Sequence, residues 1–230
     1  MGEHDRGQGE GAGCAKLGMA IENDSTIYVV DDDAATREAV ITLVSSRGLA
    51  AEGFAWADEF LRRYDPARRG CVVVDVPLAE MVALDLLRSL KGQQCRLPVI
   101  VITGDADVPR AVRVMQEGAF TLLEKPVNEA ELWQAIEHAL EVDKAQHALR
   151  RERIETEARL ATLTPDELEV FRRLLAGHAN KRIASDLDIG LRTVELRRSN
   201  IMKKMQATSL PDLVRMAILI DLLKPVGPMP

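Results

Sequence analysis

The 230-residue sequence predicts an α/β domain followed by an all-α domain. Short apolar runs alternate with helix-length segments up to residue 140, and only helical patterns follow. The charge balance changes at the same place. Residues 24–140 carry 12 Lys and Arg against 19 Asp and Glu, and residues 162–230 carry 11 against 8. This asymmetry indicates two domains, of which only the second suits a polyanionic partner.

Five apolar runs predict the strands of the first domain. Such short runs without polar alternation are typical of strands buried on both faces of a parallel sheet. Together with the helical segments between them, they predict a doubly wound α/β domain that binds ligands at the carboxyl ends of its strands. The runs are Ile27–Val30, Ala50–Phe54, Cys71–Val74, Val99–Ile102 and Phe120–Leu123.

The second domain begins at Thr164, a good N-cap, with Glu167 at the capping-box position. Between the domains, a charged segment without Gly or Pro predicts a helical linker, and a short dimeric coiled coil stays open there. The predicted helices of the second domain cover residues 165–176, 180–187, 191–205 and 209–222. The predicted segments are a disordered tail (1–23), the α/β domain (24–140), the linker (141–161), the helical domain (162–223) and a flexible tail (224–230).

Composition points away from membranes and secretion. No stretch approaches the 18 or so apolar residues of a transmembrane helix, and the N-terminus lacks the pattern of a secretory signal. The three cysteines have no metal-type spacing, which fits a reducing compartment. We therefore expect a cytoplasmic protein.

Acidic and basic side chains follow the predicted strands. Asp31 and Asp32 follow the first run, Asp75 the third, Thr103 the fourth and Lys125 the fifth. Because the carboxyl ends of parallel strands meet at one edge, these side chains converge. Clustered carboxylates require a neutralising cation, and Mg²⁺ takes such oxygen ligands. A carboxylate can also attack phosphorus, with lysine, hydroxyl and metal stabilising the phosphoryl oxygens.

The segments Tyr28–Arg37, Val101–Val112 and Glu117–Pro126 resemble the receiver domain of two-component response regulators, especially the FixJ branch. The resemblance covers residues 26–140 and implies a flavodoxin-like sheet with strand order 2-1-3-4-5. It implies that Asp75 is the phosphoacceptor and that Thr103 and Lys125 contact the phosphoryl group. It implies that Asp31, Asp32, Asp75 and the carbonyl of Pro77 hold Mg²⁺. A cis bond before Pro126 is also implied.

Some positions depart from the receiver pattern. Ala79 and Ala83 stand where the family usually has Pro and Gly, and Leu122 replaces its switch aromatic. The loop after the acceptor and the route of signalling are therefore the unusual parts. Asp105, two residues after Thr103, adds negative charge near the site, and we hypothesise that it alters acyl-phosphate lifetime or metal affinity.

The segments Leu163–Val170, Leu175–Ala184 and Arg192–Lys204 resemble the LuxR/NarL-type helix-turn-helix domain. The resemblance implies that the N-terminal part of the helix over 191–205 enters the major groove. Glu195 suits cytosine N4, with a salt bridge or a solvated position as the open alternative. The candidate DNA contacts are Asn180, Lys181, Arg192, Thr193, Glu195, Leu196, Arg197, Arg198, Ser199 and Lys203.

The family implies a transcription factor rather than an enzyme. A sensor histidine kinase phosphorylates Asp75, the receiver dimerises through residues 107–127, and the paired helical domains bind a promoter, with RNA polymerase as a partner of an activator. Two alternatives stay open. One is a phosphohydrolase with an aspartate nucleophile, against which Pro77 argues because such enzymes often carry an acid there. The other is a phosphorylation-independent DNA-binding regulator with an atypical receiver.

Overall fold

The computed structural model describes residues 24–76, 80–92, 95–104 and 107–222. Its residues form two compact units that divide between Ile136 and Glu137. Several predicted features lie outside the described residues. They are the two terminal tails (1–23 and 224–230), Pro77, Ala79 and Asp105.

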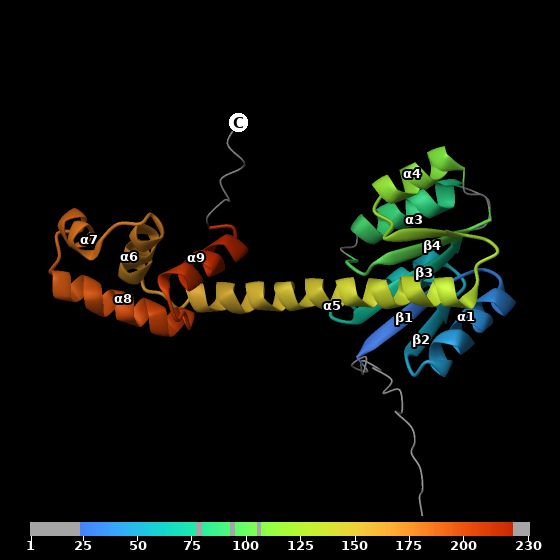
Figure 1. Ribbon diagram of the computed structural model, residues 1–230, viewed down its shortest axis with the longest axis horizontal. Coiled ribbons are helices and arrows are strands. Elements are labelled where there is room, and N and C mark those ends of the chain that lie inside the picture. Colours follow the sequence, from blue (N-terminus) through green and yellow to red (C-terminus); the bar gives the residue numbers. More distant parts are fainter. Residues whose placement is uncertain (1–23, 77–79, 93–94, 105–106, 223–230) are drawn as a thin grey trace, which may run out of the picture. The chain divides into compact units, whose positions relative to one another are not determined.

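The first unit is built on a five-stranded parallel sheet with the order β2-β1-β3-β4-β5, which confirms the predicted topology (Figure 1). All six residues of β1 are buried, as expected for a strand with partners on both sides and helices on both faces. The strands are β1 (Ser25–Val30), β2 (Ala50–Phe54), β3 (Arg69–Val76), β4 (Val99–Thr103) and β5 (Thr121–Glu124).

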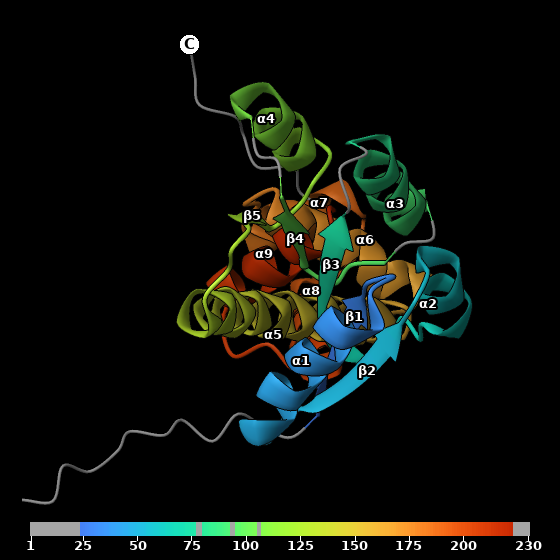
Figure 2. The same ribbon diagram turned by 90° about the vertical axis from the view of Figure 1, so that its right-hand side faces the viewer.

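Helices cover both faces of this sheet. Figure 2 shows α1 and the start of α5 on one face and α2, α3 and α4 on the other. The sequence analysis assigned no residues to α2, because seven residues make too few turns for a helical period to stand out. The helices are α1 (Ala34–Ser46), α2 (Ala57–Arg63), α3 (Glu80–Gly92), α4 (Val108–Gln116) and α5 (Glu129–Leu160).

Local signals fix where these helices begin. Asp33 caps α1 by accepting a hydrogen bond from the backbone N–H of Ala35 at 3.0 Å. Asn128 likewise accepts from the N–H of Glu131 at 2.8 Å ahead of α5. The peptide bond before Pro126 is cis, as expected. These caps place the strand-to-helix loops, and with them the acidic residues, at the carboxyl edge of the sheet.

At the amino end of the strands, Gly70 of β3 lies very close to the backbone of β1. Its φ is +147°, and a Cβ at this position would lie 1.8 Å from the carbonyl oxygen of Thr26 on β1. Only glycine allows both this backbone conformation and this approach. The register of β1 against β3 therefore depends on a glycine that the apolar pattern did not single out.

The second unit contains the rest of α5 and four short helices, close to those predicted. Their core is made of side chains from all four, including Phe171, Ile183, Val194 and Leu213. The capping box at Thr164 is present, with Glu167 as its second member, as predicted. The helices are α6 (Pro165–Leu175), α7 (Asn180–Asp186), α8 (Leu191–Met205) and α9 (Leu210–Leu219).

Candidate functional site

The carboxyl edge of the sheet brings Asp75 and Lys125 into contact. Asp75 is the seventh residue of β3 and lies inside the strand, whereas the sequence placed it just after the strand. Its side chain is only 7% exposed, and its Oδ2 accepts a hydrogen bond from Nζ of Lys125. Lys125 is fixed by its backbone, since its N–H donates to the carbonyl of Thr103 at 2.8 Å. The structure thus joins residues 50 positions apart.

The second oxygen of Asp75 is the unusual atom of the site. Oδ1 is buried and has no hydrogen-bond partner among the described residues. A buried acceptor without a partner is costly, so such an atom indicates a missing ligand or a chemical role. The carboxylate is therefore held through one oxygen while the other remains available.

Asp31 is the second buried carboxylate at this edge. Its side chain accepts from the N–H of Asp33 at 2.8 Å, and its own N–H donates to the carbonyl of Phe54 at 3.0 Å. Arg37 donates to its carbonyl at 2.6 Å. Burial raises the pKa of Asp31, and the negative charge of Asp75 adds to the rise. The hydrogen bond from the backbone N–H of Asp33 and the positive charge of Lys125 lower the pKa of Asp31.

The remaining predicted members take different positions. Asp32 is exposed, and Thr103 is the last residue of β4 and half-buried. In the described part of the chain, no group of three His, Cys, Asp or Glu side chains is placed to hold a metal ion. The structure therefore brings together Asp31, Asp75 and Lys125, whereas the side chain of Asp32 is exposed.

This arrangement nevertheless fits a hard divalent cation. Mg²⁺ keeps several of its waters and is often bound through one or two carboxylates. Two buried carboxylates, one with an unpartnered oxygen and one with a raised pKa, offer such a donor pair. A cation there would relieve the repulsion between the two carboxylates.

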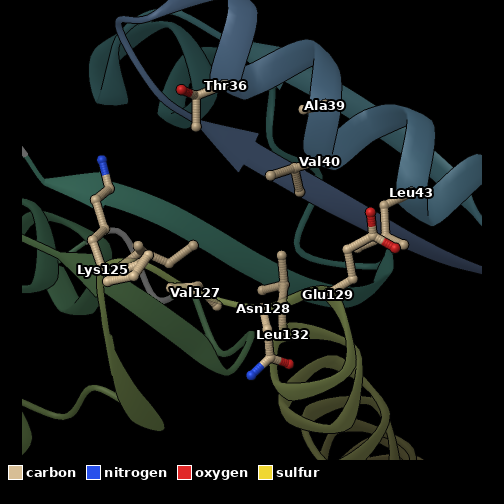
Figure 3. Close-up of a pocket in the computed structure, with 11 residues that line it drawn as sticks. Thr36, Ala39, Val40, Leu43, Lys125, Val127, Asn128, Glu129 and Leu132 are labelled. Atoms are coloured by element: carbon tan, nitrogen blue, oxygen red, sulfur yellow. The ribbon is translucent and has the colours of Figure 1, made fainter.

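A cavity of about 620 Å³ opens beside Lys125. Figure 3 shows Thr36, Ala39, Val40 and Leu43 of α1 on one side of it and the segment from Lys125 to Leu132 on the other. The sequence analysis did not predict it, because residues of α1 meet the loop before α5 only in the folded unit. The cavity leaves the Lys125 side chain 42% exposed although its partner Asp75 is buried.

In the second unit, most of the predicted DNA contacts lie on α8, and Asn180 and Lys181 lie at the start of α7. Val194, Ile201 and Met205 are buried and form an apolar stripe along the inner side of the helix. Gly190 precedes the helix as an N-cap without a side-chain hydrogen bond. The exposed members of the predicted set are Lys181, Arg192, Glu195, Leu196, Ser199 and Lys203, and the half-buried ones are Asn180, Thr193, Arg197 and Arg198.

Two arginines of α8 are held within the unit. Nη2 of Arg197 donates to the carboxylate of Asp166 at the start of α6. Nη1 of Arg198 donates to Oδ1 of Asn180 at 3.2 Å. The side chain of Arg198 therefore spans from α8 to α7. Asp166 was missed by the sequence analysis, since its pairing depends on how α6 packs against α8.

An ion pair between a buried carboxylate and a half-buried lysine links α6 and α8 as well. Glu167 is 5% exposed, and its carboxylate accepts from Nζ of Lys204 at 2.6 Å and from the N–H of Thr164 at 2.9 Å. The hydrogen bond from Lys204 is the main reason that the pKa of Glu167 lies below its ordinary value. The sequence marked Glu167 as a capping residue only, and the structure adds its role in positioning the basic helix.

A receiver-type sheet followed by a helix-turn-helix unit defines a two-component response regulator with a DNA-binding domain. Comparison with known families agrees: residues 27–137 match the response regulator receiver domain, and residues 161–217 match the luxR family of bacterial regulatory proteins. The chain therefore belongs to the family of FixJ-type response regulators, as its relatives show.

One relative is the transcriptional regulatory protein FixJ of Bradyrhizobium diazoefficiens, which is 42% identical over 84% of this chain and 94% of its own length. The response regulator protein TodT of Pseudomonas putida is 39% identical over 83% and 84%. Among solved structures, the response regulator StyR matches with a TM-score of 0.75 and 34% identity, covering 84% of this chain and 98% of that one. Full-length FixJ from B. japonicum matches with a TM-score of 0.51 and 38% identity, covering 88% and 100%.

The relatives also indicate a general role and the kinds of partner. Proteins with these names are regulators of transcription, and the combination of a receiver with a luxR-type domain implies DNA and a kinase as partners. No helix among the described residues is long and apolar enough to cross a membrane.

Proposed function

We propose that a sensor histidine kinase phosphorylates Asp75 and that this modification controls DNA binding by the second unit. The observation that supports the proposal is the state of the Asp75 carboxylate. One oxygen is oriented by Lys125, and the other is buried near Asp31 without a hydrogen-bond partner in the described part of the chain. The carboxylate is thus positioned as a nucleophile with a counter-charge already in place.

In the proposed step, a carboxylate oxygen of Asp75 bonds to phosphorus and the bond from phosphorus to the kinase histidine breaks. The electron pair of that bond stays on the imidazole, which then takes a proton. Lys125 and the hydroxyl of Thr103 would contact the new phosphoryl oxygens. Asp31, Asp32, Asp75 and the carbonyl of Pro77 would hold Mg²⁺, which would neutralise charge on the carboxylates and the phosphoryl group.

A small phosphodonor tests this step without the kinase. Incubation of the full chain with acetyl phosphate and Mg²⁺ is expected to add one phosphoryl group, detected by intact mass, and Asp75→Ala is expected to abolish it. Asp65→Ala is a matched control, because Asp65 is an exposed aspartate of the same unit that only caps a turn. Phosphorylation of Asp75→Ala to the wild-type level would contradict the proposal. We further propose that Asp75 is a stoichiometric acceptor rather than the nucleophile of an enzyme.

The output step is proposed for the helical domain, 162–223, which follows the receiver, 24–140, and the linker, 141–161. The N-terminal half of α8 would enter the major groove, and Asn180 and Lys181 would contact phosphate. The proposed contacts on α8 are Arg192, Thr193, Glu195, Leu196, Arg197, Arg198, Ser199 and Lys203. Selection of random duplexes by the phosphorylated chain is the test, and no enriched sequence would overturn it.

A homodimer of the phosphorylated receiver is also proposed, through α4 and β5. Val108, Val112 and Met115 lie on one side of α4 and are 75%, 48% and 45% exposed. Apolar side chains at this spacing suit a self-complementary contact. Val112→Glu is expected to keep the phosphorylated chain monomeric in analytical ultracentrifugation, whereas an unchanged dimer would contradict this surface. RNA polymerase would be the further partner of an activator.

A second candidate is a regulator that binds DNA without phosphorylation. It is favoured by Leu122, which packs against the core of the first unit at the position of the usual switch aromatic. An aromatic relay is therefore absent at this residue. Equal affinity of the wild-type chain, the phosphorylated chain and Asp75→Ala for the selected DNA would favour this candidate over the first.

A further inference from the structure

The side chain of Leu196 is exposed at the centre of the outer face of α8. Its exposure is 61%, although leucine gains free energy from burial. Single exposed leucines are common on proteins and need no explanation by themselves. The position of Leu196 on the helix is what sets it apart.

Helix geometry places Leu196 opposite the core of its unit. Successive residues are about 100° apart around an α-helix, so Leu196 lies about 200° from Val194. Val194, Ile201 and Met205 are all fully buried and together mark the inner face. Leu196 therefore points directly away from the unit that supports the helix.

The neighbours of Leu196 on this face are polar and exposed. Arg192 lies four residues before it, and Ser199 and Lys203 lie three and seven residues after it. Arg197 and Arg198 lie nearer the inner face, and their guanidinium groups are engaged by Asp166 and Asn180. Between the exposed cations Arg192 and Lys203, the large side chain on this outer face is thus the apolar one of Leu196.

An apolar side chain can distinguish base pairs in only one way in the major groove. It has no donor or acceptor for a base edge, but the 5-methyl group of thymine is an apolar feature that it can cover. From this placement we infer that Leu196 reads thymine, by packing against its methyl group, and is a specificity-determining residue. The inference rests on the proposed binding of α8 in the major groove.

The test replaces thymine by uracil in the DNA, which removes only the 5-methyl group of the base. The full chain is first used to select a sequence from random duplexes, and each thymine of that sequence is then replaced singly by uracil. At one thymine, the wild-type affinity is expected to fall about three- to fivefold, as for loss of one buried methyl group. Leu196→Ala is expected to bind the thymine and uracil duplexes equally.

Leu149→Ala is the matched control, because Leu149 is an exposed leucine of α5, 55% accessible, outside the proposed DNA contacts. It is expected to retain the uracil sensitivity of the wild type. Equal binding of every uracil duplex by the wild type would overturn the inference, as would the same uracil penalty in Leu196→Ala. Failure to select any sequence would instead overturn the proposed DNA binding, and the inference with it.

Discussion

Asp166, at the start of α6, accepts a hydrogen bond from the guanidinium of Arg197 in the middle of α8. Asp166 is 67% exposed and Arg197 is 23% exposed at the side chain, so the pair lies at the surface. If α8 enters the major groove as proposed, this intramolecular carboxylate would compete with DNA phosphate for the guanidinium of Arg197. We therefore expect the pair to weaken any electrostatic contribution of Arg197 to the proposed DNA binding.

Asp166→Asn is expected to release Arg197 for phosphate contact. Affinity for random-sequence duplex should rise severalfold at low salt, and the slope of log K against log salt should steepen by up to about 1. The measurement is a salt series of fluorescence-anisotropy titrations. Glu169→Gln is the control, since Glu169 pairs with Arg173 on its own helix. An identical change in both variants would show that net charge alone is responsible.

Lys125 is expected to compete with a metal ion for Asp75. Its ammonium contacts the carboxylate and adds positive charge where Mg²⁺ would bind. Lys125→Gln should tighten Mg²⁺ binding by at least about fivefold, since two unit charges ~4 Å apart interact by roughly 1 kcal/mol even in bulk water. Calorimetric titration with Mg²⁺ measures this. Weaker binding in the variant would contradict the proposed competition.

In the absence of Mg²⁺, we expect the raised pKa of Asp31 to make the folding stability of the first unit depend on pH. Burial raises its pKa in the folded state, so its protonated form favours folding. This contribution is fully present below the unfolded pKa and is lost as pH rises through the folded pKa. Asp31→Asn should therefore unfold at higher denaturant concentration than wild type at neutral pH, and the difference should shrink in acid. Both tryptophans lie in the first unit, so their fluorescence follows its unfolding.

Lys204→Met is expected to destabilise the second unit by about 1.5 kcal/mol, because the buried carboxylate of Glu167 loses a charged hydrogen-bond donor and keeps only the N–H of Thr164. The lowered pKa of Glu167 gives stability that is present above its ordinary value of 4.5 and lost as pH falls through the folded pKa. In Lys204→Met, the free energy of unfolding should therefore depend less on pH in this acidic range than in the wild type. Circular dichroism measures both effects, with Lys203→Met, at an exposed neighbour, expected to be near wild type.

Local patterns in the sequence were enough for the element order and the caps. Thr164 was identified as a helix cap from the residues that follow it, because a cap depends on atoms within three positions. The carboxyl edge of the sheet was also predictable, since parallel strands all end there. The short helix α2 and the close approach at Gly70 were not, because neither leaves a period in the sequence.

The candidate site divides in the same way. The sequence by itself determined which chemical groups stand at the strand ends and on the basic helix, because strand direction and helix period follow from local pattern. Only the tertiary structure decided which of these groups meet. Lys125 reaches Asp75, Asp32 stays exposed, Asp166 takes Arg197 and Leu196 is left outward, because each of these outcomes depends on packing between elements distant in the chain.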